Sequence, residues 1–511
     1  MLITKNHPKA RRVSLALLAL AGLLSTGCTG LAQPQILPET PDVPASWTGT
    51  QLSSAASTDG LSAEELAVWW RQLGDPVLDE LVTRIVSGNL DLQTAAARVA
   101  EARARRGLSR SELGPSVSGR VTAGRTEPLG DGIAGDSYTA TLETSWEADL
   151  FGANRLALAA SQADLEAGVE DLRAARVAVV AETVAAYADV RVAEARLKVV
   201  DDSLASREET YQLTTWREQA NLASRLEVNQ AASSLEQTRA ERPTLERRVT
   251  EARLRLALLA GESPGALDEL LTTPAAADVP APPNAVSAGI PADALRQRPD
   301  VRSAERGFAA AWARLGVAQA ARYPTLRLTG SLDAQSPDLG DLFDADAFFG
   351  NLLAGLTAPI FESGRIRENI AVREAQVDQA ALAYQSAVLG ALSEVETALA
   401  AFYRSQERIA ALDVAMQAAT EASELADQRY AAGLVDLLSV LETERTLFTI
   451  QEQLVTSRGE LLNAFSSLYR ALGGGWDAAS QDPASQDSAS RDSASQDSAS
   501  QEATDTGASN V

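Results

Sequence analysis

The chain has 511 residues, a formal net charge of −24 and only 5% aromatic residues. This acidity argues against a nucleic-acid partner held by a general basic field. The single histidine, His7, lies in a segment that we expect to be removed. Histidine-based catalytic triads and zinc binding through imidazole are then excluded, whereas enzymes that use carboxylates alone stay open. The dominance of Ala, Leu, Arg, Glu and Gln favours long helices.

Residues 1–27 have the three parts of a signal peptide. Residues 5–12 are basic, Val13–Leu24 are apolar but too few to span a bilayer, and the sequence Ser25-Thr26-Gly27-Cys28 follows. Cys28 is the only cysteine, so it cannot form an intrachain disulfide. The segment resembles a lipoprotein signal, with Ser25 where an apolar residue is usual, and this implies a covalent lipid, such as palmitate, on Cys28. A buried or incidental free thiol is the alternative. We expect residues 28–60 to form an extended N-terminal tether.

The first half of the body, residues 61–270, combines helical and strand-like segments. Two stretches of alternating polar and apolar residues predict strands at about 115–125 and 137–150. A run almost free of Gly and Pro then predicts a long antiparallel helix pair over 155–261, broken near Ala220-Asn221. Pro243 lies inside the returning helix, where it should kink the helix or interrupt its hydrogen bonds locally.

The second half, residues 271–479, repeats this plan. Strands are predicted at about 324–333 and 351–362, and a second long helix pair over 365–472. Four landmarks recur in the same order at an offset of about 210 residues, which indicates a duplicated unit. The pairs are Asn89–Leu92 with Arg298–Val301, Gly114–Gly119 with Tyr323–Leu328, Phe151–Arg155 with Phe361–Arg365, and Asn221–Val228 with Gly433–Val440. Residues 480–511 repeat Ser, Gln, Asp and Ala in short blocks, a composition typical of a disordered low-complexity tail.

The predicted fold class is therefore mainly α with a small β part. Strands of about ten residues with one apolar face fit a transmembrane β-barrel, although periodicity alone fits soluble hairpins equally well. The export signal favours the membrane. Four strands cannot close a barrel, whose smallest examples have about eight strands, so the chain must then oligomerise, and three copies would supply twelve strands. A solitary coiled coil is the alternative for the long helices.

The order of several motifs resembles the TolC-like outer-membrane efflux proteins, specifically the NodT-type lipoprotein branch that serves as the outer-membrane factor of resistance-nodulation-division pumps. The resemblance covers about residues 60–476. It rests on Trp69–Pro76, Asn89–Leu92, Trp146–Gly152, Leu295–Val301, Ala358–Arg365 and Leu472–Trp476.

This resemblance implies a homotrimer that extends from the outer membrane into the periplasm. It implies a twelve-stranded barrel in the membrane and an α-helical barrel, a tunnel of twelve long helices, in the periplasm. An equatorial belt would lie midway, built from segments near 61–90 and 265–300 and from the C-terminal region. A periplasmic adaptor and an inner-membrane pump are the implied partners. The pump would supply the energy, because the chain has no phosphate-binding Gly-Lys motif of its own.

The breaks between the long helices are the candidate gate or adaptor-contact sites, as the same resemblance implies. At the second break, Asp436 could form a ring of carboxylates in a trimer, or it could simply cap the returning helix. Asn221 replaces glycine at the first break and tolerates the left-handed backbone that such a turn needs. The other candidates at the two breaks are Trp216, Glu218, Arg429, Tyr430 and Gly433. No catalytic residue, metal ligand or cofactor other than the lipid on Cys28 is predicted.

The preferred function is a passive exit duct for small molecules in a tripartite efflux system. A duct for type I polypeptide secretion and a non-conducting periplasmic coiled-coil lipoprotein are the alternatives. The lipoprotein signal favours the first over the second. An enzyme is disfavoured because no catalytic constellation occurs in the sequence.

Overall fold

The computed structural model describes residues 41–48, 62–127, 135–272, 279–287, 289 and 291–476. The signal peptide, Cys28 and the tail from residue 480 lie outside the described residues, as does most of the tether. The chain divides into two compact units. Unit 1 takes Ala95–Asp171 and Asp300–Val388, and unit 2 takes Asp42–Thr94, Leu172–Pro299 and the chain from Leu389 on. Each unit therefore draws on both halves of the sequence.

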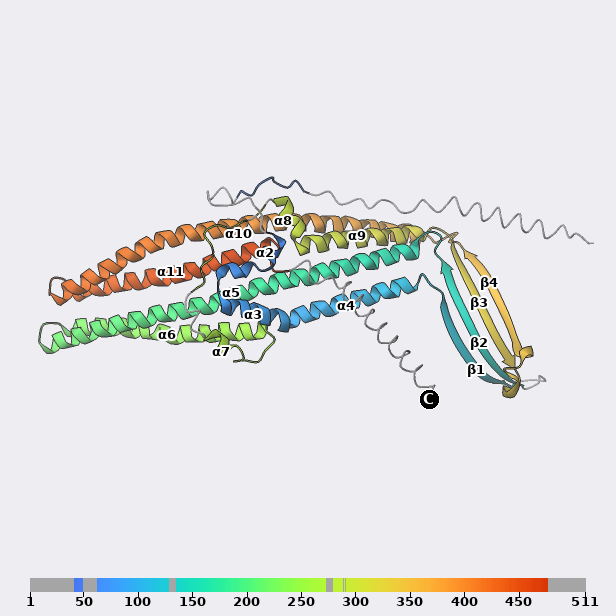
Figure 1. Ribbon diagram of the computed structural model, residues 1–511, viewed down its shortest axis with the longest axis horizontal. Coiled ribbons are helices and arrows are strands. Elements are labelled where there is room, and N and C mark those ends of the chain that lie inside the picture. The colour runs from blue at the N-terminus through green and yellow to red at the C-terminus, as the bar shows by residue number, and fades with distance from the viewer. Residues whose placement is uncertain are drawn as a thin grey trace, which may run out of the picture. The chain divides into compact units, whose positions relative to one another are not determined.

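Long helices account for most of the structure (Figure 1). Helices α5 and α10 have 67 residues each, and the returning helices α6 and α11 have 35 residues each. At about 1.5 Å per residue, each longer helix spans about 100 Å. Helix α6 continues across Pro243 although proline cannot donate a backbone hydrogen bond. The helices are α2 (Ala63–Ala67), α3 (Pro76–Gly88), α4 (Leu90–Ser111), α5 (Ala153–Gln219), α6 (Arg225–Leu259), α7 (Asp268–Leu271), α8 (Pro291–Gln297), α9 (Pro299–Ala320), α10 (Arg365–Ala431) and α11 (Leu437–Ala471), with short 3-10 turns η2 (Trp69–Leu73), η4 (Leu339–Asp341) and η5 (Ala345–Ala347).

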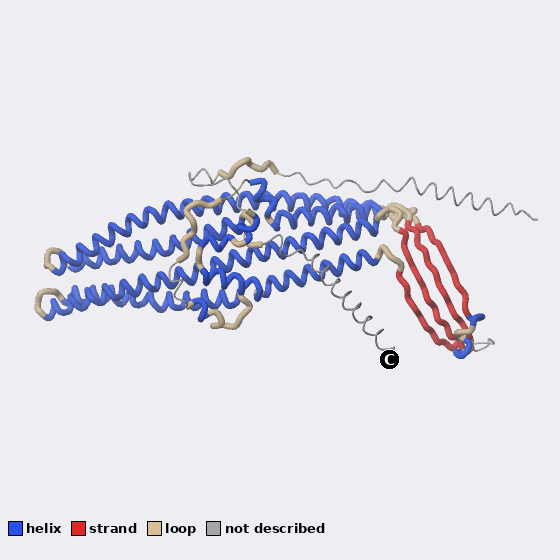
Figure 2. Tube along the Cα trace, in the orientation of Figure 1, coloured by secondary structure: helices blue, strands red, loops and turns tan. Residues whose placement is uncertain are grey.

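Unit 1 contains one antiparallel sheet in the order β1-β2-β3-β4 (Figure 1), and its strands are red in Figure 2. The strands are β1 (Ser116–Thr126), β2 (Gly135–Ala148), β3 (Thr325–Ser336) and β4 (Phe348–Thr357). Strands β2 and β3 join the two halves of the sequence, with Trp146 opposite Leu328. Strand β4 begins and ends earlier than the sequence predicted, because its pairing with β3 runs from Phe348 opposite Ala334 to Thr357 opposite Thr325. Pro359, two residues farther on, cannot donate to a ladder.

Helices α4, α5, α9 and α10 pack in that order in unit 1. Ser109 of α4 bonds Ser161 of α5, and Arg314 of α9 pairs with Asp164 of α5. Helices α9 and α10 share a small apolar cluster centred on Phe308. Among the described residues, no helix combines the length and the apolarity that crossing a bilayer requires.

Unit 2 holds the main apolar core. Trp69 stacks on Tyr469 with ring centroids 5.2 Å apart and meets the edge of Phe465. Trp47 is buried in the same cluster and donates its indole N–H to the Gly289 carbonyl at 3.0 Å. Trp69 and Trp70 are both buried in this cluster.

Helices α5 and α11 pack directly against each other in unit 2, with α6 on α5 and α10 on α11. Ion pairs mark each contact. They join Arg196 to Glu452, Arg253 to Glu194, and Arg408 to Glu460. Only six residues of α6 are buried against thirteen of α11, so α6 is the more peripheral of the two returning helices.

Candidate functional site: helix tips and belt latches

The two turns that join the long helices have the same backbone geometry. Asn221 and Gly433 both adopt left-handed conformations, with φ of 60° and 72°. In the first turn Leu222 donates its N–H to Arg217 at 2.7 Å, and in the second Leu434 donates to Arg429 at 2.8 Å. These are the bonds of a Schellman helix end. Asn221 therefore takes the backbone conformation that a glycine would be expected to supply.

The returning helices begin with different side-chain caps. Ser224 and Glu227 form a reciprocal capping box at the start of α6. Asp436 accepts from the Ser439 backbone N–H at 3.0 Å and from its hydroxyl at 2.6 Å. These hydrogen bonds lower the pKa of Asp436, so its carboxylate is ionised at neutral pH. Asp436 is thus the N-cap of α11 and is at the same time exposed.

Tyr430 is the one predicted tip residue whose side chain is buried against the other helix pair. The guanidinium of Arg217 donates to the Tyr430 carbonyl at 2.8 Å and lies 4.5 Å from the centre of its ring. The Tyr430 hydroxyl lies 3.3 Å from that of Thr214. Arg217 and Tyr430 therefore tie the end of α5 to the end of α10 within one chain, and we call this contact the tip clasp.

The other predicted tip residues lie outside the tip clasp. Trp216 and Arg429 are exposed, and Glu218 is half-buried. Arg217 belongs to the same stretch of the first tip as Trp216 and Glu218, but no sequence pattern indicates its contact with Tyr430. Nothing in the sequence distinguishes 216, 217 and 218 before the angular position on α5 is known.

A buried acid that the sequence did not single out lies farther along α11. One oxygen of Glu444 accepts from Thr210 at 2.9 Å and from Ser206 at 3.2 Å, both on α5. Burial raises the pKa of Glu444, with a smaller contribution from Asp427 of α10, while the Thr210 bond and the charge of Arg207 oppose the shift. Burial also lowers the pKa of Arg207.

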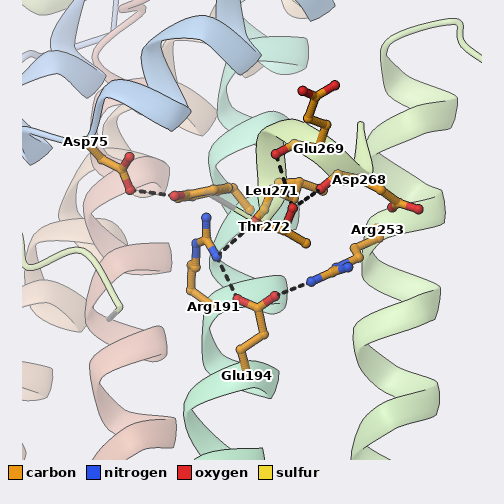
Figure 3. A network of polar contacts seen from close by, with 9 residues as sticks. Asp75, Arg191, Glu194, Arg253, Asp268, Glu269, Leu271 and Thr272 are labelled. Atoms are coloured by element: carbon orange, nitrogen blue, oxygen red, sulfur yellow. Dashed lines mark hydrogen bonds and ion pairs between the residues drawn. The ribbon is translucent and has the colours of Figure 1, made fainter. Parts of the chain in front are cut away.

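A polar network links α3, α5, α6 and the segment after α6 (Figure 3). Asp75 caps α3 through the N–H of Val77 and also accepts from the Tyr187 hydroxyl at 2.5 Å. Arg191 donates to Glu194 at 2.7 Å and to the Leu271 carbonyl at 3.3 Å. Burial raises the pKa of Tyr187, which keeps its hydroxyl protonated as the donor.

Two further contacts, the belt latches, hold the ends of the returning helices. Asn89 donates its side-chain amide to the Leu259 carbonyl at the end of α6, at 2.8 Å. Arg298 donates to the Ala471 carbonyl at the end of α11, at 2.6 Å, and pairs with Glu394 of α10 at 2.8 Å. Asn89 and Arg298 occupy matching positions of the duplicated sequence. A glycine lies against the second latch: Gly473 has a φ of 78°, and a Cβ there would lie 3.2 Å from the Cα of Arg298.

The described residues contain no group of three or more His, Cys, Asp or Glu side chains able to hold a metal ion. The contacts at the tips and latches are hydrogen bonds and charge interactions at helix ends.

Duplicated pairs of long helices, capped tips and a four-stranded antiparallel sheet together define a TolC-like channel protein. A family model described as outer membrane efflux protein matches residues 81–262 and 290–474, one stretch in each half. The chain belongs to this family and is an efflux protein of the outer membrane. The fold class and the family resemblance predicted from sequence are confirmed.

Similar proteins cover nearly the whole chain. A probable efflux pump outer membrane protein of Pseudomonas putida, TtgC, is 32% identical over 91% of this chain and 96% of its own length. The pyoverdine export outer membrane protein OpmQ of Pseudomonas aeruginosa is 31% identical over 82% of this chain and 90% of its own. The solved structure of the outer-membrane channel OprN has 32% identity and a TM-score of 0.80, covering 86% of this chain and 99% of that one.

Proposed function

We propose that three copies of this chain form one continuous duct, through which a periplasmic adaptor and an inner-membrane resistance-nodulation-division pump export small molecules. The observation that carries the proposal is the open four-stranded sheet. Both of its edge strands, β1 and β4, are exposed along their whole length. Unpaired edges of ten and eleven residues are costly in lipid, where no water satisfies the backbone.

Pairing β1 of one copy with β4 of the next removes both edges. This is a head-to-tail contact, which closes into a ring when the rotation between copies allows it. Three copies bring the sheet to twelve strands, above the minimum of about eight for a closed membrane barrel. Exposed Val117 and Val121 share one face of β1, and exposed Leu352 and Leu356 share one face of β4, which supports lipid contact on that side.

The tips supply a second, independent feature that fits an adaptor. Leu222 and Leu226 are exposed at the first turn, and Leu434 and Leu438 are exposed at the equivalent positions of the second. Four leucines on the ends of the helices form an apolar surface that a partner helix could cover. Asp436 and Arg429, also exposed, would lie at its rim.

The names of several relatives support small-molecule cargo. They are described as outer membrane proteins of toluene, solvent and antibiotic efflux pumps or of pyoverdine export. We extend this class of cargo to the present chain, and with it a purely conducting role in which the chain itself catalyses no reaction. Lipid on Cys28 would add a second attachment to the outer membrane.

The test is the mass and the conductance of the purified chain. In detergent we expect a particle with three times the mass of one chain, heat-sensitive migration on gels, and discrete conductance steps in planar bilayers. A monomer that conducts no ions would overturn the proposal. Deletion of the gene should sensitise cells to drugs or solvents, whereas lost protein secretion with unchanged drug sensitivity would reject small-molecule cargo.

A further inference from the structure

Unit 1 contains a recess of about 410 Å³ that the tips, latches and sheet do not explain. All four helices of the unit line it. Ser109 comes from α4 and Arg373 from α10, while α5 and α9 form the floor between them. Its volume lies within the range of about 300–1,000 Å³ that small-molecule sites occupy. We call it the Arg373 recess.

The floor of the Arg373 recess is apolar and its rim is polar. Small side chains of α5 and α9 make the floor, including Ala157, Ala160 and Ala318. The rim carries the hydroxyls of Ser109 and Ser161, which lie 2.6 Å apart, together with Asn369. This combination suits a molecule that has a flat hydrocarbon part and one polar group.

The charges at the rim do not cancel. Arg314 pairs with Asp164 across α9 and α5, so these two compensate each other. Arg373 donates one N–H to the neutral Gln376 at 2.9 Å, and it has no carboxylate partner among the described residues. One positive charge is therefore left over, on a planar guanidinium whose fork geometry matches a carboxylate.

We propose that the Arg373 recess binds a small organic carboxylate, with its hydrocarbon part on the alanine floor and its anionic group on Arg373. Asn369 and the paired serines would donate the further hydrogen bonds. Asp164 limits the affinity, because it neutralises Arg314 and repels an incoming anion. The site is thus a weak, reversible one, as a conducting path requires.

The position of the recess fits a transport path. The recess touches both outer helices of the four-helix layer, α4 and α10. It can face the bore if the layers of three copies close into a ring, as the proposed function states. Three recesses would then form a collar with a net positive charge in an otherwise acidic protein.

The binding test needs no membrane and uses the full chain in detergent. The probe is 1-naphthoate, and the matched neutral probe is 1-naphthamide, both titrated by ligand-observed NMR. We expect saturable binding of the carboxylate and about ten-fold weaker binding of the amide, since one charge-assisted pair is lost. Arg373→Gln should weaken naphthoate binding by a similar factor.

Two further variants separate a specific loss of binding from misfolding. Asp164→Asn should tighten naphthoate binding, because it frees Arg314, and a misfolded protein could not show a gain. Arg367→Gln is the matched control, since this arginine lies on the same helix with an exposed side chain and does not line the recess. Its affinity should equal that of the wild type.

Equal binding of the two probes, or naphthoate binding that survives Arg373→Gln, would overturn the recess proposal. A protein that conducts ions as a trimer and yet fails to bind naphthoate would overturn the recess and leave the duct intact. A protein that binds naphthoate and never conducts would overturn the duct instead.

Discussion

Removing the side chain of Arg217 should open the tips. The guanidinium makes one charge-assisted bond to the Tyr430 carbonyl at 2.8 Å and lies 4.5 Å above its ring. Such a bond contributes about 1.5–3 kcal/mol and a cation–π contact about 0.5–2 kcal/mol. Because Arg217 is only half-buried, we take the low end of both ranges, about 2 kcal/mol in all. That loss shifts the closed-to-open equilibrium of one tip by about 30-fold.

The assay is single-channel recording of Arg217→Met in planar bilayers, because methionine keeps the apolar stem and loses the donor. We expect a higher open probability at unchanged pH and salt. Arg429→Met is the matched control, since it removes the same charge from an exposed position nearby. If the two variants behave alike, charge at the tip rather than the tip clasp sets the opening, and the reasoning from the Tyr430 contact is refuted.

Three other changes test the caps, the buried acid and the latch. Asp436→Ala should raise conductance and remove the side-chain cap at the start of α11, whereas Asp436→Ser should keep the cap; an unchanged or lower conductance in the Ala variant would reject a closing role. Burial raises the pKa of Glu444 in the folded protein, so folding favours the protonated side chain. The contribution of Glu444 to the stability of the fold is therefore fully present below the pKa of the unfolded chain, about 4.3. It is lost as the pH rises through the pKa of the folded protein. Glu444→Gln should therefore raise the melting temperature more at pH 7 than at pH 4, and a gain independent of pH would contradict this. Arg298→Met should lower the free energy of unfolding by about 2 kcal/mol in a urea titration, because the buried Ala471 carbonyl loses its hydrogen-bond donor. The lost ion pair with the half-exposed Glu394 should add little to this change. An unaltered unfolding midpoint would show that the latch is dispensable.

The scarcity of glycine and proline in the long runs was enough to predict most of the fold. Helices α5 and α10 begin at Ala153 and Arg365, within two residues of the sequence prediction, because nothing in these runs interrupts a helix. Strand β4 was less predictable. Its end at Thr357 depends on pairing with Thr325 of β3, and a single sequence does not show which strand is the partner.

The candidate site was predictable only in part. Asp436 was assigned to a cap or a gate, and the local spacing to Ser439 is enough to explain the cap. The tip clasp joins residues 213 positions apart, and Glu444 meets Thr210 across 234 positions. No local pattern marks such a contact, because it exists only once the two helix pairs have packed together.

The two halves of the duplicated sequence hold the end of a returning helix with different side chains, Asn89 in the first and Arg298 in the second. In each half, the residue before a 22-residue helix must hold the end of a returning helix. Asn89 does this with its amide N–H, while its oxygen accepts from the N–H groups of Asp91 and Leu92 and so caps α4. Arg298 has no acceptor and cannot cap α9 in this way.

Pro299 resolves that conflict. Proline at the first position of α9 carries no N–H, so one donor that needs a cap is absent from the start. The arginine is then free to make a charged bond at the end of α11, where the helix dipole favours a cation. The neutral latch holds the sparsely buried α6, and the charged latch holds the deeply buried α11. The two latches therefore differ in charge although they hold equivalent points of the duplicated fold.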